Sequence, residues 1–130
     1  MGHYAKQIKK PTCYINSNDF EEVRLFIQDY IRRTTKWNHY GWHDSVLEAK
    51  SLLQLLGCFG IELKHEYGNY YSPIIKDVYV SNFFAELLEI ISPYMTKGKI
   101  VADDEYSIVT IKFKEGRYSI KYEDYEDENE

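Results

Sequence analysis

Apolar residues recur every three or four positions in three segments of the chain, which is the pattern of amphipathic helices. These segments are residues 20–31, 45–56 and 82–92. Each begins near residues whose side chains can cap a helix, namely Asn18 or Asp19, Ser45, and Ser81 or Asn82. Gly57 is suited to end the second helix, and Pro93 disfavours helical backbone at Ser92, where the third helix should end.

Shorter alternating or continuously apolar stretches between these helices are typical of strands. They are residues 4–8, 13–15, 61–65, 70–80, 99–102, 106–113 and 117–122, with Pro73 interrupting the fourth. A helix, a glycine and two strands occur from Ser45 to Ile75 and again from Asn82 to Phe113. We therefore predict one α+β domain over residues 1–122, in the order β-α-α-β-β-α-β-β-β. Its helices should pack on one face of one antiparallel sheet.

The charge of the chain is concentrated at its C-terminus. The sequence holds 16 Lys and Arg against 21 Asp and Glu, for a formal charge of −5. Residues 123–130 contain six of these acids and no base, so residues 1–122 are close to neutral. This distribution argues against a strongly basic nucleic-acid binder and against a protein that mimics a polyanion over its whole surface. We predict that residues 123–130 form a disordered acidic tail.

The remaining composition predicts a cytoplasmic protein with no membrane partner. Two cysteines, Cys13 and Cys58, are too few for a disulfide framework in a chain of this length. The first ten residues lack the apolar segment of a secretion signal, and no apolar run approaches the ~20 residues of a membrane helix. The 13 tyrosines indicate a binding surface, although an AT-rich coding sequence would produce the same excess.

The most unusual local pattern is a basic and aromatic run at the end of the first helix and in the loop 34–44. Its members are Arg32, Arg33, Lys36, Trp37, Tyr40 and Trp42. In one interpretation nucleobases stack on the aromatic rings while the basic side chains hold phosphates. In a second, the aromatic residues anchor a protein interface. In a third, Trp37 and Trp42 fill the core beneath a long loop.

Other residues with catalytic or metal-binding chemistry do not form a recognisable motif. His39 and His43 have the spacing of a helical zinc site, but Gly41 lies between them and the glutamate of HExxH is absent. The carboxylates of residues 103–105 are expected to face solvent in a tight turn, and Cys58 is expected to be buried. We therefore predict no enzyme, no metal and no cofactor.

Several stretches resemble a family of small uncharacterised proteins carried by phages and mobile elements. The resemblance involves residues 1–4 (MGHY), 89–95 (EIISPYM), 98–101 (GKIV), the acidic turn 103–105 and the strand 108–113. The chain lacks the family's glycine in the acidic turn and its tryptophan. This resemblance implies an α+β fold and a bacterial host cell, and it implies no catalytic residue.

Together these observations predict a small non-enzymatic inhibitor that binds a bacterial defence or nucleic-acid-handling protein, as an anti-CRISPR does. Its predicted partner-binding residues are Arg32, Arg33, Lys36, Trp37, Tyr40, Trp42, Tyr122, Asp124, Tyr125, Glu126, Asp127 and Glu128. The acidic tail would compete for a basic groove on the partner. Two alternatives remain: a single-stranded nucleic-acid-binding module that uses the loop 32–44, and a structural or housekeeping protein with a solubilising tail.

Overall fold

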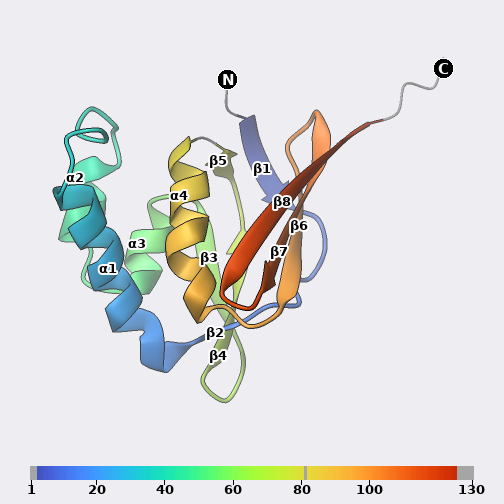
Figure 1. The fold of residues 1–130 in the computed structure, drawn as a ribbon, viewed down its shortest axis with the longest axis horizontal. Coiled ribbons are helices and arrows are strands. Elements are labelled where there is room, and N and C mark those ends of the chain that lie inside the picture. The colour runs from blue at the N-terminus through green and yellow to red at the C-terminus, as the bar shows by residue number, and fades with distance from the viewer. Residues whose placement is uncertain (1–2, 81, 126–130) are drawn as a thin grey trace.

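The computed structural model describes residues 3–80 and 82–125 (Figure 1). In chain order the elements are β1 (His3–Gln7), β2 (Ile15–Asn16), the 3-10 helix η1 (Ser17–Asp19), α1 (Phe20–Arg32), α2 (His43–Glu48), α3 (Leu52–Gly57), β3 (Ile61–Tyr67), β4 (Tyr70–Ile75), β5 (Val78–Val80), α4 (Asn82–Ile91), the 3-10 helix η2 (Ser92–Tyr94), β6 (Gly98–Asp103), β7 (Ser107–Lys114) and β8 (Arg117–Asp124). The predicted α+β class is confirmed.

The strands form two antiparallel sheets, and the prediction of a single sheet is wrong. One sheet has the order β5-β1-β6-β7-β8, and the other has the order β2-β4-β3. The cause lies at the end of β4, where the carbonyl of Gly60 accepts from the backbone N–H groups of Lys76 and Asp77. The chain turns there, leaves the β3–β4 hairpin and pairs β5 with β1, so the predicted strand 70–80 is two strands.

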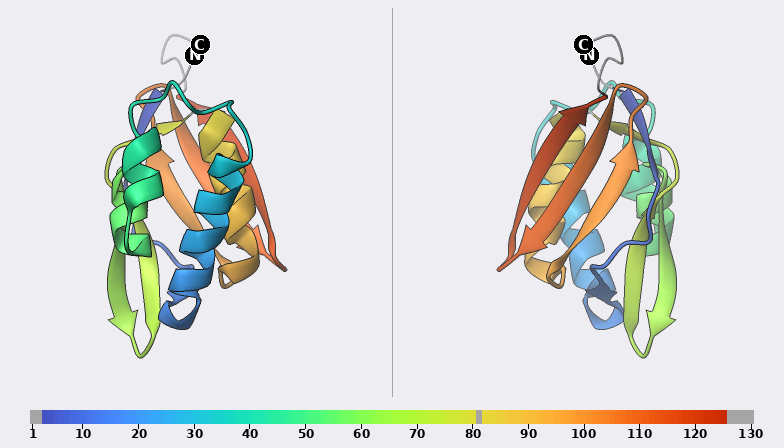
Figure 2. Two further views of the ribbon diagram at one scale, coloured as in Figure 1. Left: turned by 90° about the vertical axis from the view of Figure 1, so that its left-hand side faces the viewer. Right: turned by 90° about the vertical axis from the view of Figure 1, so that its right-hand side faces the viewer.

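The helices cover one face of the five-stranded sheet, as predicted. Figure 2 shows α1 and α4 in front of the sheet from one side, and strands β6 to β8 in front of the helices from the other. α4 contacts β5 and β8 of this sheet, and α1 packs against α3 and α4. The buried apolar side chains of these helices and strands belong to one core. They include Val23, Ile27 and Ile31 of α1, Phe84, Leu87 and Leu88 of α4, and Val109, Ile111 and Phe113 of β7. The opposite face of strands β6 to β8 is called the outer face below.

The predicted second helix, residues 45–56, is two short helices. Ala49 follows α2 with an extended backbone (φ −62°, ψ 133°), and Ser51 then caps α3 by accepting from the N–H of Gln54. The leucine spacing continues through this break, which explains why the sequence predicts one helix. Unsatisfied carbonyls at the end of a helix need other donors.

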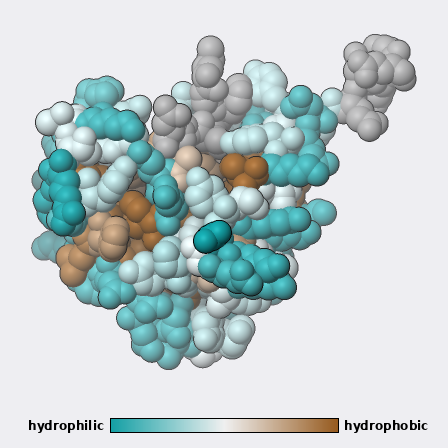
Figure 3. All heavy atoms as spheres, in the orientation of Figure 1, coloured by the Kyte–Doolittle hydropathy of each residue, from teal (hydrophilic) through white to brown (hydrophobic). Residues whose placement is uncertain are grey.

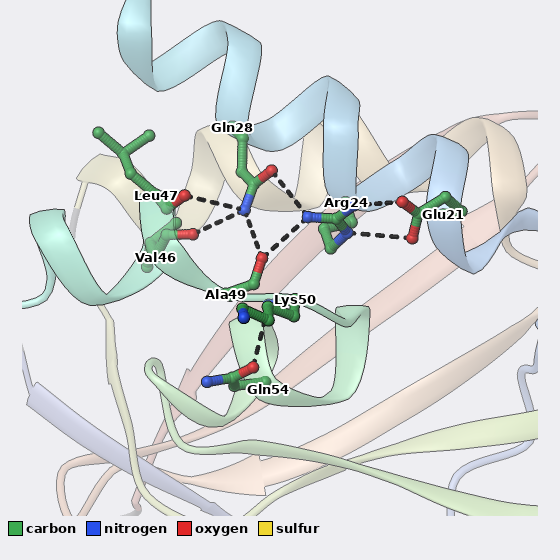
Figure 4. Close-up of polar contacts among 8 residues, drawn as sticks. All are labelled: Glu21, Arg24, Gln28, Val46, Leu47, Ala49, Lys50 and Gln54. Carbon is green, nitrogen blue, oxygen red and sulfur yellow. Dashed lines mark hydrogen bonds and ion pairs between the residues drawn. The ribbon is translucent and has the colours of Figure 1, made fainter.

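Those donors come from α1 (Figure 4). Gln28 is 2% exposed, and its Nε2 donates to the carbonyl oxygens of Val46 and Ala49, at 2.9 Å each. Arg24 donates through Nη1 to the Gln28 Oε1 at 3.2 Å and to the Ala49 carbonyl at 2.8 Å. Arg24 is itself held by hydrogen bonds to the carboxylate of Glu21. The break between α2 and α3 is therefore fixed by side chains of another helix.

Replacing Gln28 should destabilise the fold. Gln28→Leu keeps the approximate size but removes the amide donor, so the buried carbonyls at the end of α2 lose a partner. We expect the free energy of unfolding to fall by about 1–3 kcal/mol in urea denaturation. The matched control is Gln54→Leu, because Gln54 is exposed and water can replace the hydrogen bond that its Oε1 accepts from the N–H of Lys50, so its change should stay within about 0.5 kcal/mol. Equal stability of Gln28→Leu and the wild type would contradict this account.

Candidate functional site

The loop between α1 and α2 folds over the core instead of projecting from it. Trp37 is 2% exposed, and its ring meets Phe83 edge-on with the centroids 4.9 Å apart. The Nζ of Lys36 lies 4.6 Å from the centroid of the Trp37 ring. A ring in this position is unavailable for a nucleobase or a partner's pocket. Trp37 is thus corrected from a predicted partner contact to a core residue beneath the loop.

Of the other two large aromatic residues of the loop, Tyr40 is exposed, and Trp42 is partly buried against the core. Tyr40 is 36% exposed, and its ring stacks on Trp42 at 5.4 Å with an interplanar angle of 21°. Both line a cavity of about 460 Å³, here called the aromatic cleft. The aromatic residues of the cleft are Tyr4, Tyr40, Trp42, Phe59, Tyr79, Phe83 and Phe84. Its volume and apolar lining are those of a site for a small ring system or a partner side chain.

The basic residues of the loop are not gathered around this cleft. Arg33 forms an ion pair with Asp29, with 2.8 Å between Nη2 and Oδ2. Lys36 forms an ion pair with Glu86 of α4 at 3.2 Å. Arg32 is exposed in the last turn of α1. The predicted combination of stacking rings and phosphate-binding cations within residues 32–44 is therefore not assembled.

Strand β8 extends into the segment that was predicted to be an acidic tail. Strand β8 continues to Asp124, and the N–H of Tyr125 donates to the carbonyl of Tyr106 at 3.4 Å. Glu123 and Asp124 thus belong to the sheet and Tyr125 is bonded next to it, so the assignment of residues 123–125 to a disordered tail is wrong. Tyr122 and Tyr125 are 48% and 50% exposed, and Asp124 is also exposed. Glu126, Asp127 and Glu128 lie outside the described residues.

The two predicted groups of partner-binding residues lie at opposite edges of the five-stranded sheet. The aromatic cleft includes Tyr79 of β5, the strand at one end of the sheet. Tyr122 and Asp124 belong to β8, the strand at the other end. A single small ligand cannot contact both groups.

A third surface, which the sequence reasoning missed, gathers positive charge on the outer face. A groove of about 400 Å³ is lined by five basic residues and by no Asp or Glu of the described chain. These five residues, here called the basic cluster, are Lys97, Lys99, Lys112, Lys114 and Arg117. None of them forms an ion pair with a described residue.

The strand register sets these charges directly against one another. Lys99 of β6 lies opposite Lys112 of β7, and Lys114 of β7 lies opposite Arg117 of β8. Opposite residues in antiparallel strands have Cβ atoms about 4.5–5.5 Å apart, and like charges at that separation are unfavourable. The arrangement costs stability in the free protein and creates a strongly positive surface for an anion.

The signal for the basic cluster was present in the sequence but was spread over three segments. Lys112 and Lys114 are two residues apart in β7 and so project from one side of that strand, while Lys99 lies in β6 and Lys97 just before it. Summing the charge of residues 1–122 hid this grouping, because acids elsewhere balance it. Only the pairing of β6, β7 and β8 shows that the charges converge.

Other surfaces provide weaker candidates. Apolar residues show over the helices on the left of the face seen in Figure 3. Leu25 and Phe26 of α1 and Leu53 of α3 are exposed. Exposed apolar side chains alone do not identify a ligand. Among the described residues, no helix is long and apolar enough to cross a membrane.

His43 and Asp104, from the histidine and acidic motifs considered above, form hydrogen bonds or ion pairs with residues close to them in the chain. The Nδ1 of His43 lies 3.0 Å from Oδ1 of its neighbour Asp44. Within the described residues, no group of three or more His, Cys, Asp or Glu side chains could hold a metal ion. Asp104 is 3% exposed and accepts from the N–H of Ser107 at 2.7 Å, so its predicted exposure to solvent is wrong. Cys58, predicted to be buried, is only partly buried.

The order of residues 123–125 can be tested through the carboxyl of Asp103. Hydrogen bonds from Tyr125 and from the N–H of Glu105 lower the pKa of Asp103, and the same contact raises the pKa of Tyr125 to about 12. Tyr125→Phe should therefore raise the pKa of Asp103, as measured by NMR titration of the side-chain carbon. Tyr122→Phe is the control and should leave it unchanged.

The lowered pKa of Asp103 makes its contribution to stability larger at neutral pH than in acid. A carboxyl whose pKa is lower in the folded protein stabilises it above the unfolded-state pKa. That stabilisation is lost as the pH falls through the lowered pKa of Asp103. The stability difference between wild type and Tyr125→Phe should accordingly be present at neutral pH and vanish in acid. An unchanged Asp103 titration in Tyr125→Phe would contradict the observed position of Tyr125.

Comparison with known proteins assigns no function to these surfaces. The chain matches no protein-family model, no curated protein and no solved structure. The resemblance to phage and mobile-element proteins remains a prediction.

Proposed function

We propose that this chain is a non-enzymatic protein that binds nucleic acid through the basic cluster. The observation that carries the proposal is the opposed like charges of Lys99 with Lys112 and of Lys114 with Arg117. Their mutual repulsion is relieved when a polyanion lies across the strands. The phosphate backbone of nucleic acid is the polyanion that suits this spacing of cations, because its charges are regular and close together.

The expected contacts are to phosphates and not to bases. Four of the five cations are lysines, which act as compact point charges, and the groove is bordered on the outer face by Ser119. The stacking rings of the aromatic cleft lie at the β5 edge, away from the cluster. Phosphate contacts position nucleic acid without reading its sequence. Binding should therefore show weak sequence preference and strong dependence on salt.

Acidic residues limit where the ligand can lie. Asp103 of β6 and Glu123 of β8 project on the outer face at the ends of their strands away from the basic cluster. They repel phosphates, so a strand of nucleic acid is directed to the Lys99 and Lys112 end. This one-ended charge distribution is compatible with a formal charge of −5 for the whole chain.

The second candidate function is the predicted inhibitor of a bacterial defence or nucleic-acid-handling protein. The specific observation that favours it is the aromatic cleft, whose rim includes Tyr4 and Tyr79, 58% and 42% exposed. Tyrosines with one buried end and one exposed end are common at protein interfaces. Their rings meet edge-on at 5.1 Å, so they present one apolar unit.

The salt dependence of binding tests the first proposal. Fluorescence anisotropy with a labelled oligonucleotide should show binding that weakens as salt rises. Lys99→Ala with Lys112→Ala should weaken it and reduce the slope of log K against log salt by about 2, about 1 for each lost phosphate contact. The control carries Lys10→Ala and Lys76→Ala, whose lysines form ion pairs with Glu66 and Glu62.

The control should retain wild-type affinity and slope. Absence of binding at low salt, or equal losses in the two double variants, would contradict the assignment to the basic cluster.

The second candidate function gives a different result: a pull-down with CRISPR effector complexes should recover a stable complex, which Tyr4→Ala with Tyr79→Ala should weaken. Recovery of no complex would count against the inhibitor.

A further inference from the structure

Strand β8 lies at an end of the five-stranded sheet, and within the described chain no strand pairs with its outer edge. The strand has eight residues, most of them exposed. A long exposed edge carries a row of N–H and C=O groups that can pair with another chain. Natural proteins usually shorten, twist or cover such edges, so an uncovered edge of this length is expected to pair with a strand of another chain.

The hydrogen-bond pattern shows which backbone groups face this open edge. Glu115 and Gly116 have positive φ values of 53° and 75°, and they join Lys114 to Arg117 in a two-residue hairpin turn. The residues that close such a turn are bonded to each other, and the N–H of Tyr125 again points to β7. Odd-numbered residues of β8 thus bond to β7, and the backbone groups of even-numbered residues point to the open edge.

We infer that two copies of this chain pair through their β8 strands, antiparallel and about a two-fold axis at Ile120. An antiparallel pair must set outward-facing backbone groups opposite one another, so even-numbered residues must meet even-numbered residues. The axis at Ile120 satisfies this condition. It places Tyr118 opposite the partner's Tyr122, and Arg117 opposite the partner's Glu123. The two-fold symmetry makes each contact twice.

The charged side chains of β8 favour this register over the two registers whose axes lie at Ser119 and at Lys121. An axis at Ser119 would place Arg117 opposite the partner's Lys121, and an axis at Lys121 would place that lysine opposite the partner's Lys121. Like charges directly opposite are unfavourable, whereas opposite charges stabilise a pair of strands. With the axis at Ile120, Arg117 and Glu123 are complementary, and Ser119 faces the partner's Lys121 without repulsion.

The inner side of β8 offers a place for the partner's tyrosine. Tyr122 is 48% exposed, while Tyr118 and Ile120 are partly buried. A groove of about 600 Å³ borders Tyr118 and Ile120 and extends to Glu89 and Ser92 near the end of α4. Pairing would bring the partner's Tyr122 beside Tyr118 at this groove. An aromatic pair there adds contact area that an edge strand lacks by itself.

The same pairing sets the acidic end of each β8 against the basic end of the other. Asp124 would lie opposite the partner's Gly116, which sits between Lys114 and Arg117 of the partner's basic cluster. Association of two copies therefore does not depend on nucleic acid. It should also weaken as salt rises, because part of its energy is charge pairing at an exposed edge.

Sedimentation equilibrium of the full chain without nucleic acid tests the pairing. The wild type should show a monomer–dimer equilibrium. Arg117→Glu alone and Glu123→Arg alone should each raise the dimer dissociation constant about tenfold, because two attractive contacts become repulsive. The combined variant exchanges the charges and should restore association to near the wild-type value. Lys9→Glu is the control for the change of charge and should not weaken it, because Lys9 is exposed and lies outside β8.

Cross-linking tests the axis directly. Only the residue on a two-fold axis lies opposite its own copy, and a hydrogen-bonded pair has Cα atoms about 5.5 Å apart, within disulfide range. In a Cys58→Ser background, Ile120→Cys should form a disulfide-linked dimer on oxidation, and Ser119→Cys should not.

Three results would overturn the inference: a wild type that stays monomeric at high protein concentration, no recovery in the combined charge variant, or a cross-link at Ser119→Cys in preference to Ile120→Cys. The proposed nucleic-acid function is tested separately. The variant with Lys99→Ala and Lys112→Ala should still dimerise, so the failure of one proposal is distinguishable from the failure of the other.

Discussion

The side-chain amide of Gln28 holds α1 against the point where the chain leaves α2 and enters α3. Helices of six residues are too short to be stable alone, so both depend on contacts with the rest of the molecule. With α2 fixed, the preceding loop is closed over the core, and Trp37 is pressed onto Phe83 of α4. The positions of Tyr40 and Trp42 in the wall of the aromatic cleft thus depend on the buried hydrogen bonds of Gln28.

The two faces of the five-stranded sheet have different roles: the inner face stabilises the fold, and the outer face carries the surface proposed to bind nucleic acid. The inner face carries apolar residues of β7 that pack beneath the helices, so substitution there would disrupt the fold. The outer face carries the basic cluster at one end and Asp103 and Glu123 at the other. Because side chains alternate between faces, neighbouring residues of one strand can serve these two purposes independently. A near-neutral domain can in this way present a concentrated charge.

Much of the fold could be predicted because its strongest patterns are local. The 3.6-residue periodicity of α1 and α4 and the alternation in β7 appear directly in the sequence. The split between α2 and α3 could not be predicted, since its cause is Gln28, 18 residues before Val46. The pairing of β1 with β5 also joins distant segments, so the division into two sheets was hidden. The basic cluster required the register of three strands, and the burial of Trp37 required the position of α4.

The strand order has a consequence for the strength of binding. The aromatic cleft stands at the β5 edge, and the edge inferred to pair belongs to β8. Two copies joined at β8 would form one continuous sheet with a cleft at each end, separated by nine strand spacings, or roughly 40 Å. Such an assembly is bivalent, with a span fixed by the sheet and not by a flexible linker. A target with two matching sites at that distance would be held far more tightly than a target with one.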